Sequence, residues 1–328
     1  MIGRTAIAVA CVEAVLIAAT AIVALDISAH HRVEDVDGLN MWGYRGRVAL
    51  RRQPNEVRVE VVGGTRAFGW GERGSSLASQ IRRLMLLAID RPGAPARSVI
   101  VVNVGRLGAL PDSYPAAIDH YAYLRPDIVC IYDDLGVRGA APPARSAIFE
   151  TTGYAPALPM VLSEKGRAWR AGSVARSDAG GPAGPESSAA KRLAGAALES
   201  IGDTLSAADA RAARWLRSDD GVRGDGARAV PASERAYADA MLAAIETAHR
   251  RARAVVVVLS PAETAEQPVN AAALRSRLTA APWLRIVDLD VEPRLRRADL
   301  RYDGWNYNGV ATTITAEHIT PAVLASLQ

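Results

Sequence analysis

The sequence predicts an α/β fold built on a parallel sheet and preceded by one N-terminal helix of membrane-spanning length. Three observations carry this prediction. Short apolar runs recur along the chain, as expected for parallel strands that are buried on both faces. Amphipathic helical segments separate these runs, which is the pattern of βαβ units. The first apolar run, residues 5–25, has about the length that crosses a bilayer, roughly 20 residues.

The composition limits the classes of function. The chain has 328 residues, enough for one large α/β domain or two smaller ones. Its net charge is +4 and its arginines are scattered, so no nucleic-acid partner is expected. The two cysteines, Cys11 and Cys130, cannot define a disulfide framework, and no Cys/His cluster has the spacing of metal ligands. We therefore expect neither a metal nor another cofactor.

Residues 5–25 admit two interpretations. An uncleaved anchor uses the whole run, whereas a signal peptide would be cleaved after Ala29. Arg4 precedes the run, which favours an N-terminus on the inside and an exported body. Residues 1–29 are therefore expected to be an anchor or a signal peptide, and residues 30–55 a lead-in segment.

Glu13 interrupts this apolar run. An ionised carboxylate near the bilayer centre costs roughly 2.5–3.5 kcal/mol on insertion scales. Two explanations are open: the carboxyl group stays protonated or reaches toward the interface, or it pairs with a polar group on a partner helix. The second explanation makes the Glu13-containing helix a candidate contact with another membrane protein.

The body then alternates strands and helices. The expected strands are residues 57–62, 98–104, 128–132, 254–259 and 284–289. The expected helices are residues 75–89, 115–124, 233–251 and 271–280, and a closing helix includes residues 314–317. Residues 139–226 interrupt this order and are expected to form a flexible insertion over the edge of the sheet. Within it, residues 189–216 are expected to form two short Ala-rich helices.

Residues 57–71, VRVEVVGGTRAFGWG, hold the first motif. A β-branched strand ends at Gly63 and Gly64, and Thr65 follows with a hydroxyl side chain. Because a helix comes next, this hydroxyl is expected at the carboxyl edge of the sheet, where α/β folds place their active sites.

This stretch resembles the first motif of the SGNH (GDSL-type) hydrolases, a strand followed by Gly-Asp-Ser or Gly-Gly-Ser and then Phe-Gly. Residues 103–108 resemble the second motif, Asn-x-Gly-x-x-Gly. Residues 126–136 resemble the third, and residues 303–306 resemble the last, Asp-x-x-His. Residues 40–46 are similar to the lead-in of membrane-tethered members. The resemblance implies a three-layer α/β/α, flavodoxin-like domain over residues 56–328.

The resemblance also assigns positions to a site. Thr65, Asp303 and Asn306 take the positions of the nucleophile, the orienting acid and the base. Gly108 takes the position of one oxyanion donor, and Gly136 that of the Asn that supplies the second. In that family the Asp orients the His, and the His removes the proton of the Ser, a logic that recurs on unrelated folds.

Several of these positions depart from the family pattern. Thr65 keeps a hydroxyl, but its methyl group crowds a tight turn. Asn306 cannot accept a proton at neutral pH, so the hydroxyl stays un-ionised and weakly nucleophilic. Gly136 has no side-chain donor. Asp134, at the position of a glycine, and Asp133 before it would add negative charge where an oxyanion must be stabilised.

His318 offers a second register for the base. His318-Ile-Thr-Pro321 is similar to the His-Leu-Thr-Pro form of the family's base motif, but Thr315 then stands where the orienting Asp should be. The alternative is that His318 is a surface residue of the closing helix. Both interpretations remain open on the sequence.

Three functions follow from the resemblance. The first is a membrane-anchored, exported SGNH-like protein with impaired catalysis that associates with acylated cell-envelope carbohydrate, because relatives with this layout act on acyl groups of exported polysaccharides. The second is an active esterase or acyltransferase that uses Thr65. The third is a scaffold that recruits a membrane polysaccharide-modification complex through the insertion and the Glu13-containing helix. An ester-hydrolysis assay separates the second from the others.

Overall fold

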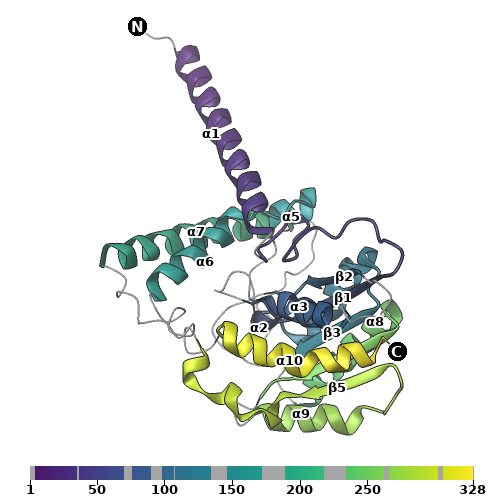
Figure 1. Ribbon diagram of the computed structural model, residues 1–328. Helices are drawn as coiled ribbons and strands as arrows, with labels where there is room; N and C mark the ends of the chain where they lie inside the picture. Colours follow the sequence, from purple (N-terminus) through teal and green to yellow (C-terminus); the bar gives the residue numbers. More distant parts are fainter. Residues whose placement is uncertain are drawn as a thin grey trace.

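The computed structural model describes residues 4–34, 37–69, 76–89, 98–106, 108–133, 146–171, 189–217, 234–261, 266–301 and 306–327. Its centre is a parallel sheet of five strands in the order β2-β1-β3-β4-β5 (Figure 1). The strands are β1 (Glu56–Gly63), β2 (Ser98–Asn103), β3 (Ile128–Asp133), β4 (Ala254–Leu259) and β5 (Leu284–Asp288). The parallel α/β fold that the apolar runs predict is therefore confirmed.

Helices connect the strands of this body. They are α2 (Thr65–Phe68), α3 (Leu77–Ile89), α4 (Tyr114–His120), α8 (Glu234–Arg251), α9 (Glu266–Arg277) and α10 (Gly309–Ala325). Short 3-10 turns occur at Pro111–Ser113, Ala122–Leu124, Leu289–Val291, Pro293–Arg296 and Ala298–Leu300. Apart from α2, each helix overlaps a segment with the helical pattern in the sequence.

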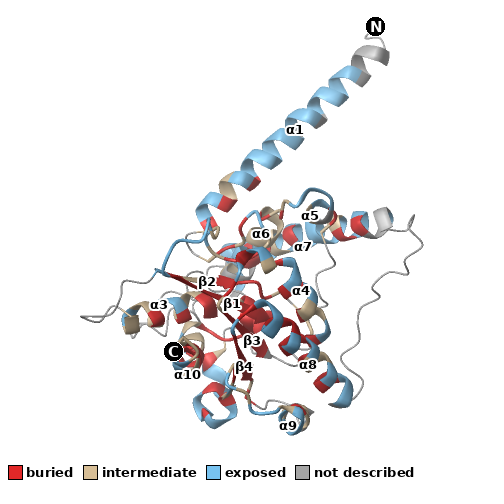
Figure 2. Cartoon of the chain, turned by 90° about the vertical axis from the view of Figure 1, so that its right-hand side faces the viewer, coloured by how far each residue is buried: buried red, intermediate tan, exposed pale blue. Residues whose placement is uncertain are grey.

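The side chains of the strands point alternately into two hydrophobic cores. Val59 and Val61 of β1 join residues of α3 and α10 in one core. Val62, on the opposite face of β1, joins residues of α4, α8 and α9 in the other. Figure 2 shows the buried residues gathered around the strands. Burial on both faces explains why these strands read as continuous apolar runs.

The strand order reverses at the first strand. The chain passes from β1 to β2 through α3, and then returns through α4 to β3 on the other side of β1. Such a reversal leaves a crevice outside the carboxyl ends of the two central strands, where doubly wound proteins bind their ligands. In this chain the reversal lies between β1 and β3, at the carboxyl ends of these two strands.

Helix α1 (Arg4–Val33) projects away from the body (Figures 1 and 2). It is long and apolar enough to cross a membrane. Its described side chains are exposed as far as Leu25, whereas Asp26 and His30 are buried against the body. The helix thus continues past residue 29, and its last turns belong to the packed part of the molecule.

Three helices form a layer between the body and the protruding part of α1 (Figures 1 and 2). They are α5 (Ala147–Thr152), α6 (Leu158–Ala171) and α7 (Ala189–Arg217). The expectation of two short helices in residues 189–216 is wrong, because α7 is one helix of 29 residues. Gly195 and Gly202 weaken its intrinsic helix propensity, but both lie where α6 approaches so closely that a Cβ atom would clash.

Candidate functional site

Thr65 is the first residue of α2 and lies at the carboxyl end of β1, as the motif predicts. It is 5% exposed. Gly63, two residues earlier, faces β3, and a Cβ atom there would lie 2.4 Å from the carbonyl oxygen of Tyr132. Only glycine fits between these strands without a shift of the backbone. The turn therefore places Thr65 at the carboxyl edge of the sheet.

The structure brings Thr65 and Gly108 together. The backbone N–H of Gly108 donates a hydrogen bond of 3.0 Å to Oγ1 of Thr65. Gly108 has a φ of +62°, in the left-handed region that favours glycine. A backbone N–H at this place can stabilise negative charge that develops on a nearby oxygen. It cannot remove a proton, so it holds the hydroxyl in place without ionising it.

Asn103 fixes the loop that carries Gly108 against α2. Its Nδ2 donates to the carbonyl oxygens of Ala67 at 2.8 Å and Phe68 at 3.2 Å. Its Oδ1 accepts a hydrogen bond of 3.0 Å from the N–H of Gly105. A Cβ atom at Gly105 would lie 2.8 Å from the Phe68 nitrogen. The second motif thus acts as a brace that keeps its own loop beside the Thr65 helix.

The segment that contains Asn306 also meets α2. Asn306 is buried, and its neighbour Tyr307 lies under the guanidinium group of Arg66, 4.3 Å from the Arg66 Cζ atom to the ring centroid. Arg66 directly follows Thr65 in the chain. The first and last motifs therefore contact each other through the residues next to their candidate positions.

Three of the site positions lie outside the described residues: Asp134, Gly136 and Asp303. Asp133 ends β3, but its side chain is also outside the description. Their roles stay predictions from the sequence.

His318 has a carboxylate partner on the side of α10. Its Nε2 lies 3.1 Å from Oε2 of Glu292. The hydrogen bond from Arg294 is the main reason that the pKa of Glu292 falls to about 2, and the bond with His318 adds to it. His318 is ten residues beyond the N-cap Asn308, about 15 Å along the helix axis. Of the two interpretations of His318, the structure shows the surface residue of the closing helix, with the side chain one-third exposed.

The other histidines with ring contacts lie in other parts of the fold. His30 lies between the carbonyl oxygens of Leu39 and Ala155. His120 contacts the rings of Tyr121 and Phe149, and His249 stacks on Trp283. None of these contacts involves Thr65, so these rings are not placed to act as its base.

Arg45 lies in the lead-in motif, and sequence analysis assigned no role to it. It is buried, and its guanidinium Cζ atom lies 4.4 Å from the ring centroid of Phe68 in α2. One nitrogen donates 2.7 Å to Oε1 of Glu164 in α6, and Nε donates 2.7 Å to the carbonyl oxygen of Asp37. The lead-in segment therefore links the Thr65 helix to the layer below α1.

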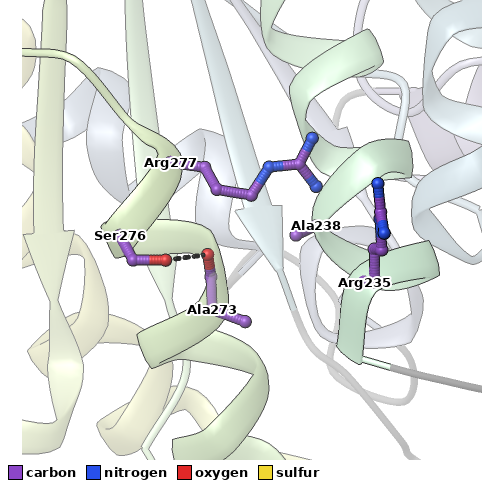
Figure 3. A pocket seen from close by; sticks show the side chains of 5 residues that line it. All are labelled: Arg235, Ala238, Ala273, Ser276 and Arg277. Atoms are coloured by element: carbon purple, nitrogen blue, oxygen red, sulfur yellow. Dashed lines mark hydrogen bonds between the residues drawn. The ribbon is translucent and has the colours of Figure 1, made fainter.

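A recess elsewhere is separate from this site. It lies between α8 and α9 and is lined by Arg235, Ala238, Ala273, Ser276 and Arg277 (Figure 3). Arg277 pairs with Asp239 at 2.7 Å. Neither helix supplies a motif residue. Within the described ranges, no group of three or more His, Cys, Asp or Glu side chains is placed to hold a metal ion.

Comparison with known proteins does not extend the resemblance. No protein-family model matches the sequence, and a search of curated proteins found no significant match.

Proposed function

We propose that this chain is a membrane-anchored, SGNH-hydrolase-like protein whose Thr65 site binds acylated carbohydrate of the cell envelope with little or no hydrolysis. In this proposal α1 spans the membrane with its N-terminus inside, and the body is exported. The body has the three-layer, flavodoxin-like arrangement of that family. The strand order and the helices packed in both cores support this arrangement.

One observation carries the proposal: the 3.0 Å hydrogen bond from the Gly108 N–H to the Thr65 hydroxyl. The Gly108 N–H occupies the Thr65 oxygen as an acceptor, so the O–H of Thr65 is the donor that an ester carbonyl oxygen meets at this edge.

The nearby residues do not supply the remaining catalytic parts. Asn306 stands at the position of the base, and an amide takes no proton at neutral pH. The second oxyanion donor is absent from the sequence, since Gly136 replaces the Asn. Loss of one such donor alone costs about 10²–10³ in kcat, and loss of the triad base costs several further orders of magnitude. This arrangement is therefore expected to bind the ester without hydrolysing it.

The experiment compares the binding of an acetylated oligosaccharide with that of the same oligosaccharide after deacetylation, using the full-length protein in detergent. We expect the acetylated form to bind more tightly. Thr65→Val keeps the side-chain volume but removes the hydroxyl, and should weaken binding of the acetylated form by about 2–12-fold, since one hydrogen bond contributes about 0.5–1.5 kcal/mol.

Thr247→Val is the matched control, because it removes a buried hydroxyl from α8. It should leave both affinities unchanged. Equal binding of the two oligosaccharides by the wild type would refute the proposed ligand. Wild-type hydrolysis well above background that disappears in Thr65→Val would instead assign an active esterase.

A further inference from the structure

An apolar stripe runs along the outside of α7. Successive members are three, four or seven residues apart, which places them on one side of the helix. They are Leu193, Ala197, Ile201, Leu205, Ala208 and Trp215, and all six are exposed. The four largest are 41–73% exposed, and Leu193 and Trp215 are the most exposed of them. We call these six residues the α7 stripe.

The point where α1 would leave a bilayer is tied to the start of α6. Leu25 is the last exposed apolar residue before Asp26, which is buried. Oδ1 of Asp26 accepts a hydrogen bond of 2.6 Å from the N–H of Leu158, the first residue of α6. The hydroxyl of Tyr154 donates 2.5 Å to Oδ2 of the same carboxylate. Helix α6 therefore begins at the level at which α1 enters the body.

Helix α7 is held against α6. A Cβ atom at Gly166 of α6 would lie 2.5 Å from the carbonyl oxygen of Gly195 and 2.5 Å from the nitrogen of Glu199, both in α7. Such close contact fixes one helix on the other. Figures 1 and 2 place both helices in the layer between the body and the protruding part of α1. The α7 stripe is thus carried at the end of the body where α1 emerges.

The acidic side chains of α7 have partners in the neighbouring helices α5 and α6. Its three acidic side chains are held by α5 and α6: Glu199 pairs with Arg170, Asp203 accepts from Ser163, and Asp209 accepts from the N–H of Ile148. None of them belongs to the stripe. The helix also carries five basic residues, Lys191, Arg192, Arg211, Arg214 and Arg217. A helix with this charge balance suits the anionic headgroups of a lipid surface.

We propose that the α7 stripe lies on the lipid surface as an interfacial helix, beside the point where α1 leaves the bilayer. This inference rests on the membrane anchoring by α1 in the proposed function. Interfacial helices bury their apolar face about 5–10 Å into the boundary between headgroups and acyl chains, and Trp side chains such as Trp215 favour that depth. Two contacts with the membrane fix the orientation of the body, which one helix alone does not.

The test uses the full chain in vesicles of three parts phosphatidylcholine and one part phosphatidylglycerol. Cys11 is first replaced by Ala, and Cys130 stays because it is buried. An environment-sensitive fluorophore is attached at Leu205→Cys or at Ala207→Cys. Both positions are exposed, but they lie about 200° apart around the helix because an α-helix has 3.6 residues per turn.

We expect a fluorophore at position 205 to shift to shorter wavelength and to lose about half or more of its emission to nitroxide-labelled lipid, because of the burial depth of about 5–10 Å. A fluorophore at position 207 should change little. Equal quenching at both positions, or none at either in protein that floats with the vesicles, would overturn the inference.

Two further outcomes are distinguished by the same samples. Protein that does not float with the vesicles contradicts anchoring by α1, and with it the localisation in the proposed function. Energy transfer between labels at position 205 on different molecules, without lipid quenching, would mean that a second copy of the chain covers the stripe. That result would also overturn the inference.

Discussion

At the scale of single residues, Thr65 and Gly108 form the contact on which the proposed site rests. Their contact needs only a hydroxyl and a backbone N–H. Proton removal, in contrast, depends on the side chain at position 306, and an amide does not supply it. In the proposed function, ligand recognition and catalysis therefore depend on different residues.

The first prediction concerns the recovery of hydrolysis. The full-length protein should hydrolyse p-nitrophenyl acetate near the background rate. The triple variant Thr65→Ser, Gly136→Asn and Asn306→His restores the family pattern at the three departing positions, and we expect measurable turnover from it. Thr65→Ser alone should change little, because a serine without a base gains almost nothing over a threonine.

The assay measures p-nitrophenolate release. The reference rates are those in buffer without protein and with denatured protein. Turnover in the single variant equal to that of the triple variant would contradict the assigned role of position 306.

Glu60 is a second residue at this scale, and its burial sets its pKa. It lies in β1, it is 1% exposed, and neither of its carboxyl oxygens has a hydrogen-bond partner in the described part of the chain. Burial raises the pKa of Glu60 well above its usual value. The folded state thus holds this proton more tightly than the unfolded state does, and the stability must fall as the pH rises above about 4.5.

The second prediction follows from this fall of stability with rising pH. Glu60→Gln keeps a buried polar group that cannot titrate, so its free energy of unfolding relative to the wild type should increase from pH 4 to pH 7. Glu60→Leu also removes the polar group and should be about 1–3 kcal/mol more stable than the wild type at pH 7. Urea denaturation at the two pH values measures both effects. A pH-independent difference for Glu60→Gln would show that the pKa of Glu60 is the same in the folded and the unfolded state, which contradicts the raised pKa.

At the scale of elements, the pair α6–α7 is built on glycines. Gly166, Gly195 and Gly202 each lie where a Cβ atom would meet backbone atoms of the opposite helix at 2.5–2.7 Å. These glycines trade helix propensity for close approach, and the pair gains its stability from packing.

The third prediction tests this contact with Gly166→Ala. In a free helix the change would stabilise by about 1 kcal/mol. Here the added methyl group forces the helices apart, and overpacking of this kind costs about 1–3 kcal/mol. Lys165→Ala, at the exposed neighbouring position, is the control and should leave the stability almost unchanged. A gain of stability in Gly166→Ala, measured by urea denaturation of the full chain, would contradict the close packing.

At the scale of the whole molecule, one chain of contacts joins the apolar helix α1 to the candidate site. Asp26 of α1 caps α6, and Glu164 of α6 binds Arg45. Arg45 in turn lies over Phe68, at the end of the helix that begins with Thr65. A signal peptide cleaved after Ala29 would remove Asp26 from these contacts, which favours an anchor that stays in place.

The fourth prediction is that the full-length protein stays in the membrane pellet after a carbonate wash. Its C-terminus should be accessible to protease from outside the cell. Asp26→Ala should not release the protein, since anchoring depends on residues 5–25, but it should lower the stability of the body. Recovery of a soluble form that begins near His30 would show that the segment is a cleaved signal peptide.

The sequence by itself determined the α/β class, the five strands and the N-terminal helix. Each of these depends on a pattern within a short window: continuous apolar runs for strands that are buried on both faces, and helical spacing between them. It also placed Thr65 at the end of β1, because a residue between a strand and the following helix lies at the carboxyl end of that strand.

Only the tertiary structure decided the features that depend on distant residues. The bond between Gly108 and Thr65, the burial of Arg45 against Glu164 and the cap of Asp26 on α6 join segments far apart in the chain. The same reason makes α7 one helix, because its glycines are stabilised by contact with α6 and not by their own propensity. A pattern within a short window does not identify contacts between residues far apart in the chain, because only folding brings those residues together.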